Sequence, residues 1–261
     1  MRRNLGWLIC TILMLSVTII SWKPANANKV NINSTSGLSA KAILENYVSS
    51  IYDSAHLEES GLAPEVFKKA LTGFINLKID NKLPQNASIL TVIDFAKSSC
   101  EKRMWIIDVM SKALILNTWV AHGQGSGEDM ASHFSDHMES HQSSLGFYVT
   151  DDVYYGKNGR SLRLDGMDAG FNTNARARAI VVHAADYVSE NTILENGRLG
   201  RSFGCPAVSP EVAEMVINTI KDKTVMFING NNENYTSKYL DEDLAAAFVS
   251  QGPGNSYIAN L

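Results

Sequence analysis

The sequence has few cysteines, which excludes a fold held together by disulfide bonds. It contains 3 cysteines in 261 residues, and Cys10 lies in an N-terminal apolar run, so only Cys100 and Cys205 are left to form a bridge. Small secreted scaffolds need several bridges to compensate for a small core. A chain of this length can bury a sufficient core without them. Each of the two remaining thiols therefore needs its own explanation.

The sequence also lacks an excess of positive charge. Its 23 Lys and Arg residues against 27 Asp and Glu residues give a net charge of −4. Proteins that bind nucleic acid through its phosphates present a basic surface to them. We therefore expect no nucleic-acid partner.

Long apolar runs are missing except near the N-terminus. Arginines at positions 2 and 3 precede an uncharged run over residues 5–22, and Ala25-Asn-Ala27 follows it. This is the layout of a secretory signal peptide, so residues 1–27 are predicted to be removed after Ala27. The mature chain would carry a net charge of −7. We expect it to be exported to the periplasm or cell envelope and to keep no stable membrane anchor.

Three alternatives for this N-terminus are disfavoured. A lipoprotein anchor at Cys10 would need a small residue before it, and Ile9 is large. Twin-arginine export is indicated only by the arginine pair itself. A retained transmembrane helix would not need the Ala-x-Ala pattern that precedes residue 28.

Residues 28–84 are predicted to form a linker and a helical segment. Residues 28–37 are polar and rich in Asn and Ser, as linkers are. Apolar residues then recur at helical spacing after Ser39, a suitable N-cap, and after Pro64, which suits a first helical turn. We expect the two helices to support the domain that follows, because nothing in them is typical of chemistry.

Residues 85–230 are predicted to form the main domain. They contain short runs rich in Val, Ile, Tyr and Trp between turn signals, which is typical of antiparallel β structure. Strands are expected at 89–95, 103–109, 113–122, 145–150, 153–155, 161–164, 179–187 and 224–229, with a hairpin turn at 156–159 and a helix at 210–221 capped by Ser209. Residues 231–261 are expected to be a C-terminal tail with a weak helix at 240–249. The predicted fold class is mainly β with flanking helices.

Cys205 and His183 are the candidate catalytic pair. His183 ends an apolar run, and Cys205 follows Gly204 in a turn before a predicted helix. A thiol nucleophile needs a base within hydrogen-bond reach and a cation or helix start that lowers its pKa. Arg198 and Arg201 precede Cys205 as such cations. Gly204 permits close backbone approach and can leave backbone N–H groups for an oxyanion.

The general alternative for a free cysteine is a buried apolar side chain. Cys100 lies in Ser98-Ser-Cys-Glu101, and no histidine is near it in the sequence. We therefore expect Cys100 to be structural and Cys205 to be reactive.

One stretch resembles the catalytic region of the L,D-transpeptidases, the YkuD-type domain. It runs from Arg178-Ala-Ile-Val-Val-His183 to Gly197-Arg-Leu-Gly-Arg-Ser-Phe-Gly-Cys-Pro-Ala-Val208, and it is most similar to the divergent branch described as murein L,D-transpeptidase catalytic domain proteins. The similarity continues upstream through Trp119-Val-Ala-His-Gly-Gln-Gly-Ser126 and Ser140-His-Gln-Ser-Ser-Leu-Gly-Phe-Tyr148, so it covers about residues 85–230. It implies an L,D-transpeptidase-like β-sandwich preceded by a small helical segment.

The resemblance also implies roles for individual residues. Cys205 matches the nucleophile and His183 the general base, while Ser202 and Gly204 match the turn that shapes the oxyanion site. The residues expected to contact substrate are Arg198, Arg201, His122, Gly123, His141, Ser143 and Ser144. No metal and no cofactor is expected.

Three departures from the family pattern concern the surroundings of the pair. Phe203 stands where the common pattern has a second histidine, Ala184 replaces the glycine after the base, and a Pro-Ala pair follows Cys205 in place of a hydrophobic residue and an arginine. Arg198 or Arg201 is then the expected substitute cation. We expect these changes to affect substrate recognition more than acyl transfer.

The implied activity is that of a murein L,D-transpeptidase acting on peptidoglycan stem peptides. The Cys205 thiolate would attack the carbonyl that precedes D-alanine in a tetrapeptide stem, and D-alanine would leave with a proton from His183. An amine of a second stem would then resolve the thioester. Asp186 would face away from His183 on a strand, so we expect a backbone carbonyl to orient the imidazole.

Three competing hypotheses remain at this point. His133, His137 and His141 recur every four residues and on a helix would line one face, as metal ligands do, which suggests a metal-dependent peptidoglycan hydrolase. Water in place of the acceptor amine would make the protein an L,D-carboxypeptidase. A non-catalytic wall-binding module is disfavoured because a nucleophile and a base are both present.

Overall fold

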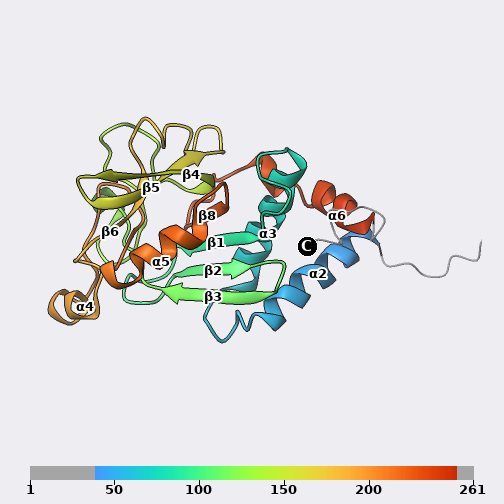
Figure 1. Cartoon of the computed structure of the whole chain (residues 1–261), viewed down its shortest axis with the longest axis horizontal. Helices are drawn as coiled ribbons and strands as arrows, with labels where there is room; N and C mark the ends of the chain where they lie inside the picture. Colours follow the sequence, from blue (N-terminus) through green and yellow to red (C-terminus); the bar gives the residue numbers. More distant parts are fainter. Residues whose placement is uncertain (1–38, 252–261) are drawn as a thin grey trace, which may run out of the picture. The chain divides into compact units, whose positions relative to one another are not determined.

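The computed structural model describes residues 39–251 of the chain (Figure 1). The predicted signal peptide, residues 1–27, and the predicted linker at 28–37 lie outside the described residues. Within residues 39–251, none of the helices is both long and apolar enough to cross a membrane.

The two predicted N-terminal helices are confirmed. Helix α2 (Ala40–Ser54) begins after Ser39, whose hydroxyl oxygen accepts a hydrogen bond from the Ala42 N–H at 3.2 Å. Helix α3 (Pro64–Ile79) begins at the proline, where the missing N–H costs no helical hydrogen bond. Both helices bury their apolar faces against one side of the sheet, in a core that contains Phe67, Phe74 and Trp105.

The sheet has eight strands in the described part of the chain, and the predicted fold class, mainly β with flanking helices, is confirmed. The strands are β1 (Ile89–Asp94), β2 (Met104–Asp108), β3 (Ala113–Thr118), β4 (Gly146–Gly156), β5 (Gly159–Gly166), β6 (Val181–Ala184), β7 (Ala207–Val208) and β8 (Val225–Asn229). Their spatial order is β3-β2-β1-β8-β4-β5-β6-β7. The β1–β8 and β6–β7 pairs are parallel, so the sheet is mixed rather than purely antiparallel.

Strand β4 joins two runs that the sequence analysis separates. Asp151 and Asp152 interrupt the apolar pattern, but the structure accommodates them as a bulge, where the pairing with β5 shifts register between Thr150 and Val153. Arg176 and Lys223 both pair with the Asp151 carboxylate, which stabilises this charge at the bulge. The hairpin turn at Lys157-Asn158 follows, as predicted.

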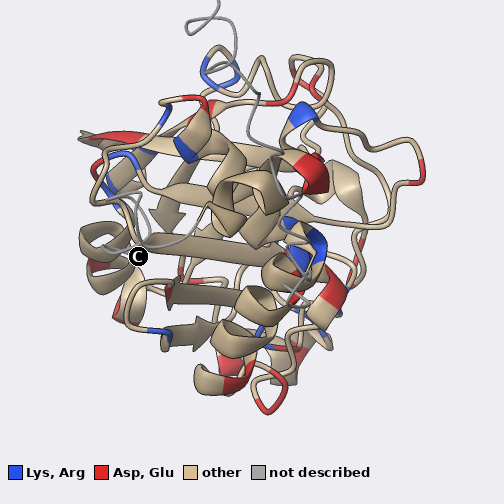
Figure 2. Cartoon of the chain, turned by 90° about the vertical axis from the view of Figure 1, so that its right-hand side faces the viewer, with Lys and Arg blue, Asp and Glu red and all other residues tan. Residues whose placement is uncertain are grey.

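Two apolar cores lie on opposite faces of the sheet. One contains the inward faces of α2 and α3 together with the C-terminal helix α6 (Glu242–Ser250), and Figure 1 shows α2 and α6 side by side. The other is enclosed by the curved sheet and helix α5 (Pro210–Ile220), which contacts β1, β5 and β6. Figure 2 shows segments of Lys and Arg interspersed with segments of Asp and Glu around strands that are mostly uncharged.

The two ends of the sheet approach each other at a seam. Ala121, three residues after β3, pairs with Ala207 of β7 through two backbone hydrogen bonds of 2.8 and 3.3 Å. Gly123 and Ser202 form a second bridge beside it. The seam therefore brings the segment at 121–123 against the segment that contains Cys205, which lies in the bend before β7, while His183 lies on the neighbouring strand β6.

Four elements near the seam differ from the sequence prediction. Strand β3 ends at Thr118 and not at residue 122, and β7 lies where no strand was predicted. Strand β6 is shorter than the predicted 179–187, because Ala179 has a left-handed backbone (φ 54°) and the chain turns again after Ala185. Helix α4 (Glu190–Asn196) was not predicted, since none of its residues is buried and it has no apolar pattern to show. Ser189 caps it by accepting from the Thr192 N–H at 3.2 Å. At α5, Ser209 occupies the predicted N-cap position without donating or accepting a capping side-chain bond.

The last residues that the structure describes, from η2 to α6, pack on the N-terminal helices. The short helix η2 (Lys238–Leu240) and α6 follow β8, and α6 contacts α2 and α3. The Asn76 side chain of α3 donates to the carbonyl oxygens of Tyr239 and Asp241, each at 2.8 Å. These bonds hold the end of the described chain on the face of the sheet opposite α5.

Candidate active site

Cys205 and His183 line one cavity. Ala207 pairs with His183 across the parallel β6–β7 ladder, and Cys205 precedes Ala207 by two residues. Cys205 itself lies in the bend that precedes β7, so the turn at residues 202–205, and not strand alternation, sets the position of its side chain. Both side chains line a cavity of about 750 Å³, together with Arg178, Arg201 and other residues. The structure thus brings the predicted nucleophile and base together.

The Cys205 thiol lies against the backbone at the start of β6. Its Sγ accepts from the Val181 N–H at 3.5 Å and lies 3.6 Å from the Ala179 carbonyl oxygen. No hydrogen bond joins Sγ to His183 within residues 39–251. Burial raises the pKa of the Cys205 thiol above its ordinary value, while the Val181 N–H and the charge of Arg178 oppose the rise.

The His183 imidazole is held by one backbone carbonyl. Its Nδ1 lies 2.8 Å from the carbonyl oxygen of Ala184, and because a carbonyl only accepts, Nδ1 carries the proton. The Nε2 atom is therefore the one that can accept a proton. The side chain is 4% exposed, and burial lowers the pKa of His183 below its ordinary 6.5 against the opposing effect of the Ala184 carbonyl. A backbone carbonyl orients the imidazole, as the sequence analysis expects.

Residues 202–205 form the turn that carries the predicted nucleophile, and we call them the nucleophile turn. Hydrogen bonds fix this turn on both sides of Gly204. The Gly204 N–H donates to Ser202 Oγ at 3.0 Å, and Ser202 Oγ in turn donates to the Cys205 carbonyl oxygen at 2.6 Å. Ser143 Oγ donates to the Gly204 carbonyl oxygen at 3.2 Å. The Gly204 N–H is thus engaged and not free for an oxyanion. The Cys205 N–H has no hydrogen-bond partner among the described residues, so it is the donor left beside the thiol.

Gly204 is required in this turn by its conformation and its packing. Its φ of 119° lies in a region that L side chains rarely adopt. A Cβ atom at this position would lie 2.8 Å from the Gln142 carbonyl oxygen and 3.3 Å from Arg178 Nη2. The turn therefore packs directly on the segment at 140–144.

Gly123, Ser143 and Ser144 lie beneath the turn. A Cβ at Gly123 would lie 2.4 Å from the His141 carbonyl oxygen and 2.8 Å from the Gly204 Cα. Ser143 and Ser144 are almost fully buried, and neither they nor Gly123 line the cavity. The structure brings these three predicted substrate residues to the site, in positions that support the nucleophile turn.

Replacing Gly123 with alanine should destabilise the protein and misplace the nucleophile. We expect a loss of about 3 kcal/mol in the free energy of unfolding, because a methyl group would overlap buried backbone. Gly170→Ala is the control: it has a left-handed φ of 81° but open space around it, so its cost should be about 1 kcal/mol. Urea denaturation of both variants measures the difference, and equal costs would contradict the described packing.

His122 is part of a buried pair and does not line the cavity. The side chain is fully buried, and its Nδ1 lies 2.8 Å from Nη2 of the buried Arg103. An arginine only donates, so Nδ1 is the acceptor and the imidazole is neutral. Burial and the Arg103 charge lower the pKa of His122 to about 4. His122 therefore packs inside the protein and supports the segment at 121–123 that forms the seam.

The two predicted cations share an acidic partner away from the thiol. Arg198 Nε and Arg201 Nη1 pair with Glu128 at 3.0 and 2.8 Å. Arg201 lines the cavity, and Arg198 does not. The charge of Arg178, by contrast, lowers the pKa of Cys205 against the larger, opposite effect of burial.

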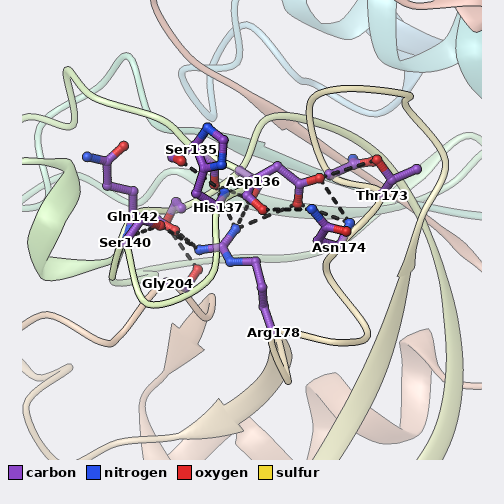
Figure 3. A network of polar contacts seen from close by, with 12 residues as sticks. Ser135, Asp136, His137, Ser140, Gln142, Thr173, Asn174, Arg178 and Gly204 are labelled. Carbon is purple, nitrogen blue, oxygen red and sulfur yellow. Dashed lines mark hydrogen bonds and ion pairs between the residues drawn. The ribbon is translucent and has the colours of Figure 1, made fainter.

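Arg178 is the site residue that the sequence analysis misses. It stands five residues before His183 in the turn that leads into β6, and its side chain is 3% exposed. Figure 3 shows its guanidinium reaching across to the segment at 135–142 and to Gly204. The apolar pattern predicts strand β6. It does not predict where the side chain of Arg178, which precedes the strand, will point.

A match to a family model decides the family of the chain. Residues 58–229 match the model of the L,D-transpeptidase catalytic domain, which is more than half of the chain. The chain belongs to this family. No curated protein matches the sequence.

Several solved structures match this chain at low sequence identity. An L,D-transpeptidase from Mycobacterium smegmatis is 12% identical over 55% of this chain and 59% of its own, with a TM-score of 0.34. The helical cell shape determining protein Pgp2 from Campylobacter jejuni is 12% identical over 69% of this chain and 62% of its own, with a TM-score of 0.36. An L,D-transpeptidase from Stackebrandtia nassauensis is 11% identical over 75% of this chain and 93% of its own, with a TM-score of 0.34. Because these scores are low, family membership depends on the sequence match alone.

The histidine series of this L,D-transpeptidase domain is not helical. His133, His137 and His141 lie in a loop between Ser126 and β4, so the shared helix face on which the metal hypothesis depended is not formed. His141 instead stacks on Phe203, with ring centroids 4.4 Å apart. Within residues 39–251, no group of three or more His, Cys, Asp or Glu side chains is placed to hold a metal ion.

Cys100 lies outside the cavity. Its thiol donates to the Gly197 carbonyl oxygen at 3.2 Å, and its own carbonyl oxygen accepts from Trp119 Nε1 at 3.0 Å. These contacts tie the loop after β1 to the end of α4. Cys100 thus has a structural environment and serves as an internal control for experiments on Cys205.

Proposed function

We propose that this protein is a murein L,D-transpeptidase that transfers acyl groups between peptidoglycan stem peptides through a Cys205 thioester. The observation that supports this most directly is that Cys205 and an oriented His183 line the same cavity. Family membership supports the acyl-transfer chemistry. The signal-peptide pattern at residues 1–27 supports export to the periplasm or cell envelope, where stem peptides are found.

The resting pair is proposed to be neutral. Burial raises the pKa of Cys205 and lowers that of His183, and both shifts favour the uncharged forms. His183 Nε2 then takes the thiol proton as the sulfur attacks the stem carbonyl next to D-alanine. The sulfur–carbon bond forms, and the oxyanion is stabilised by the free N–H of Cys205.

The second half of the reaction returns the same groups to their starting state. The C–N bond to D-alanine breaks, and the D-alanine amine leaves with the proton held on His183. The amine of a second stem then attacks the thioester and gives a proton to His183, and the thiol is regenerated as the new amide forms. Water in place of the amine would give an L,D-carboxypeptidase with the same catalytic residues.

Incubation with a disaccharide tetrapeptide, followed by chromatography of the products, tests the assignment. We expect D-alanine release together with dimers linked between two third-position residues. D-alanine release without dimers would assign the carboxypeptidase reaction instead. Neither product, under conditions where the chain is folded, would contradict the proposal.

Removal of metal ions should leave this activity unchanged. A thiol nucleophile with an imidazole base needs no Lewis acid. Dialysis against a chelator is expected to alter neither the rate of D-alanine release nor the melting temperature. Loss of activity that is restored by added zinc would favour the metal-dependent hydrolase.

A further inference from the structure

The guanidinium of Arg178 joins two parts of the site that are distant in sequence. Nη1 donates to the Ser135 carbonyl oxygen at 2.7 Å and to Ser144 Oγ. Nη2 donates to the Gln142 carbonyl oxygen at 2.6 Å and to Ser140 Oγ at 3.2 Å. All four partners lie between Ser135 and Ser144, in the loop that precedes β4. A single side chain therefore fixes both ends of this segment.

That loop forms the floor of the nucleophile turn. A Cβ at Gly204 would lie 2.8 Å from the Gln142 carbonyl oxygen and 3.3 Å from Arg178 Nη2, and Ser143 Oγ donates to the Gly204 carbonyl oxygen. The position of Gly204 sets the position of the Cys205 backbone. Figure 3 shows Gly204 beside this loop and Arg178. Displacing the loop would therefore displace the thiol that follows Gly204.

The charge of Arg178 is only partly neutralised. The four hydrogen bonds go to neutral oxygens, and the one acidic contact within residues 39–251, to Asp136 Oδ1, is 3.8 Å long. Asp136 is itself engaged by the Asn174 N–H at 2.9 Å and by Thr173 Oγ1 at 3.3 Å. Arg201, by contrast, pairs with Glu128 at 2.8 Å. A buried cation without a close counter-ion acts strongly on groups nearby, because little water screens it.

We infer that Arg178 is the positioning residue of the Cys205 site: it holds the loop at 135–144 beneath the Gly204 turn and supplies the positive charge beside the thiol. This inference deepens the proposed function, because it concerns the thiol through which acyl transfer is proposed. It assigns to Arg178 the part that the sequence analysis gave to Arg198 or Arg201. The direction of the Arg178 effect on the pKa of Cys205 agrees with it.

The test is the pH dependence of thiol alkylation in the full chain. Iodoacetamide reacts with the thiolate, and mass spectrometry of the peptide that contains Cys205 follows its labelling without any peptidoglycan substrate. The charged and titratable groups that face the thiol are His183 from β6, Arg178 from the turn before it, Asp186 and Tyr187 from the segment after it, and Arg201 from the loop before the nucleophile turn. Failure of the proposed function would leave this readout intact, so the two outcomes are distinguishable.

Arg178→Met should raise the midpoint of alkylation by about one pH unit, so the rate at pH 7 falls roughly tenfold. Arg178→Lys keeps the charge and should restore most of the midpoint, although it cannot reproduce the forked hydrogen bonds. Arg201→Met is the matched control, a cavity arginine whose charge is paired, and its midpoint should stay unchanged. A shift in Arg201→Met with none in Arg178→Met would overturn the inference.

Asp136→Asn covers the case in which Arg178→Met fails to fold. It leaves Arg178 and its four hydrogen bonds in place and removes the negative charge nearest the guanidinium. The net positive potential at the thiol then increases, so the alkylation midpoint should move to lower pH. A midpoint that stays or rises in a variant with an unchanged melting temperature would overturn the electrostatic part of the inference.

Discussion

Cys205→Ala should abolish acyl transfer while the protein remains folded. The substitution removes the nucleophile, so we expect D-alanine release from a tetrapeptide stem to fall by at least roughly a thousandfold. The thiol is only partly buried and its hydrogen bonds are with backbone atoms, so the loss of stability should stay near 1 kcal/mol. The rate of D-alanine release and the melting temperature are the two measurements.

Cys100→Ala is the matched control for this variant. It removes a thiol of similar burial whose hydrogen bond goes to Gly197, outside the cavity. We expect nearly full activity. Activity retained in Cys205→Ala, or lost only in Cys100→Ala, would exclude Cys205 as the nucleophile.

His183→Gln should have the next largest effect. The glutamine amide can donate to the Ala184 carbonyl oxygen as Nδ1 does, but it cannot accept a proton from the thiol. We expect kcat to fall by about 10²- to 10⁴-fold with little change in KM. His133→Gln, at an exposed loop position outside the cavity, should behave as the unmodified protein.

The pH profile of the unmodified protein tests the same role. Burial lowers the pKa of His183, so the imidazole stays in its neutral, proton-accepting form at pH values somewhat below 6.5. Activity should therefore persist below pH 6.5 and fall as the pH drops through the lowered pKa. A loss of activity that already begins above pH 6.5 would contradict the assignment of the base. So would an acid side of the profile that is the same in His183→Gln as in the unmodified protein.

The sequence predicts the helices that bury an apolar face and most strands, because their signals are local. Ser39 and Pro64 mark helix starts through backbone chemistry within a few residues, and both helices begin where expected. The candidate pair also comes from local features, since His183 lies near the end of an apolar run and Cys205 follows a glycine in a tight turn; its catalytic role stays a prediction. Such features need no knowledge of the rest of the fold.

Local sequence patterns do not predict which distant segments pair with each other. The parallel pairing of β1 with β8 joins segments more than a hundred residues apart, and the bridge between Ala121 and Ala207 closes the sheet at the site. Strand periodicity is the same for parallel and antiparallel neighbours, so neither arrangement is predictable from it. For the same reason the sequence predicts that Gly123 contacts substrate, whereas in the structure it packs beneath Gly204.

The sequence does not show which arginine lies near Cys205, for a related reason. Arg198 and Arg201 are close to Cys205 in the sequence, yet both side chains turn to Glu128. Arg178 is 27 positions away and is brought to the thiol by the pairing of β6 with β7. Sequence proximity is thus a poor guide to which cation acts on a nucleophile.

The central claim is that Cys205 carries the acyl group, and trapping that intermediate tests it most directly. The protein is mixed with a disaccharide tetrapeptide, the reaction is stopped with acid within one turnover, and the digested chain is analysed by mass spectrometry. We predict an added mass equal to the stem without its D-alanine on the peptide that contains Cys205, which disappears when an acceptor amine is supplied and dimers form. Release of D-alanine with no adduct on that peptide, or with the same rate in Cys205→Ala, would contradict the account.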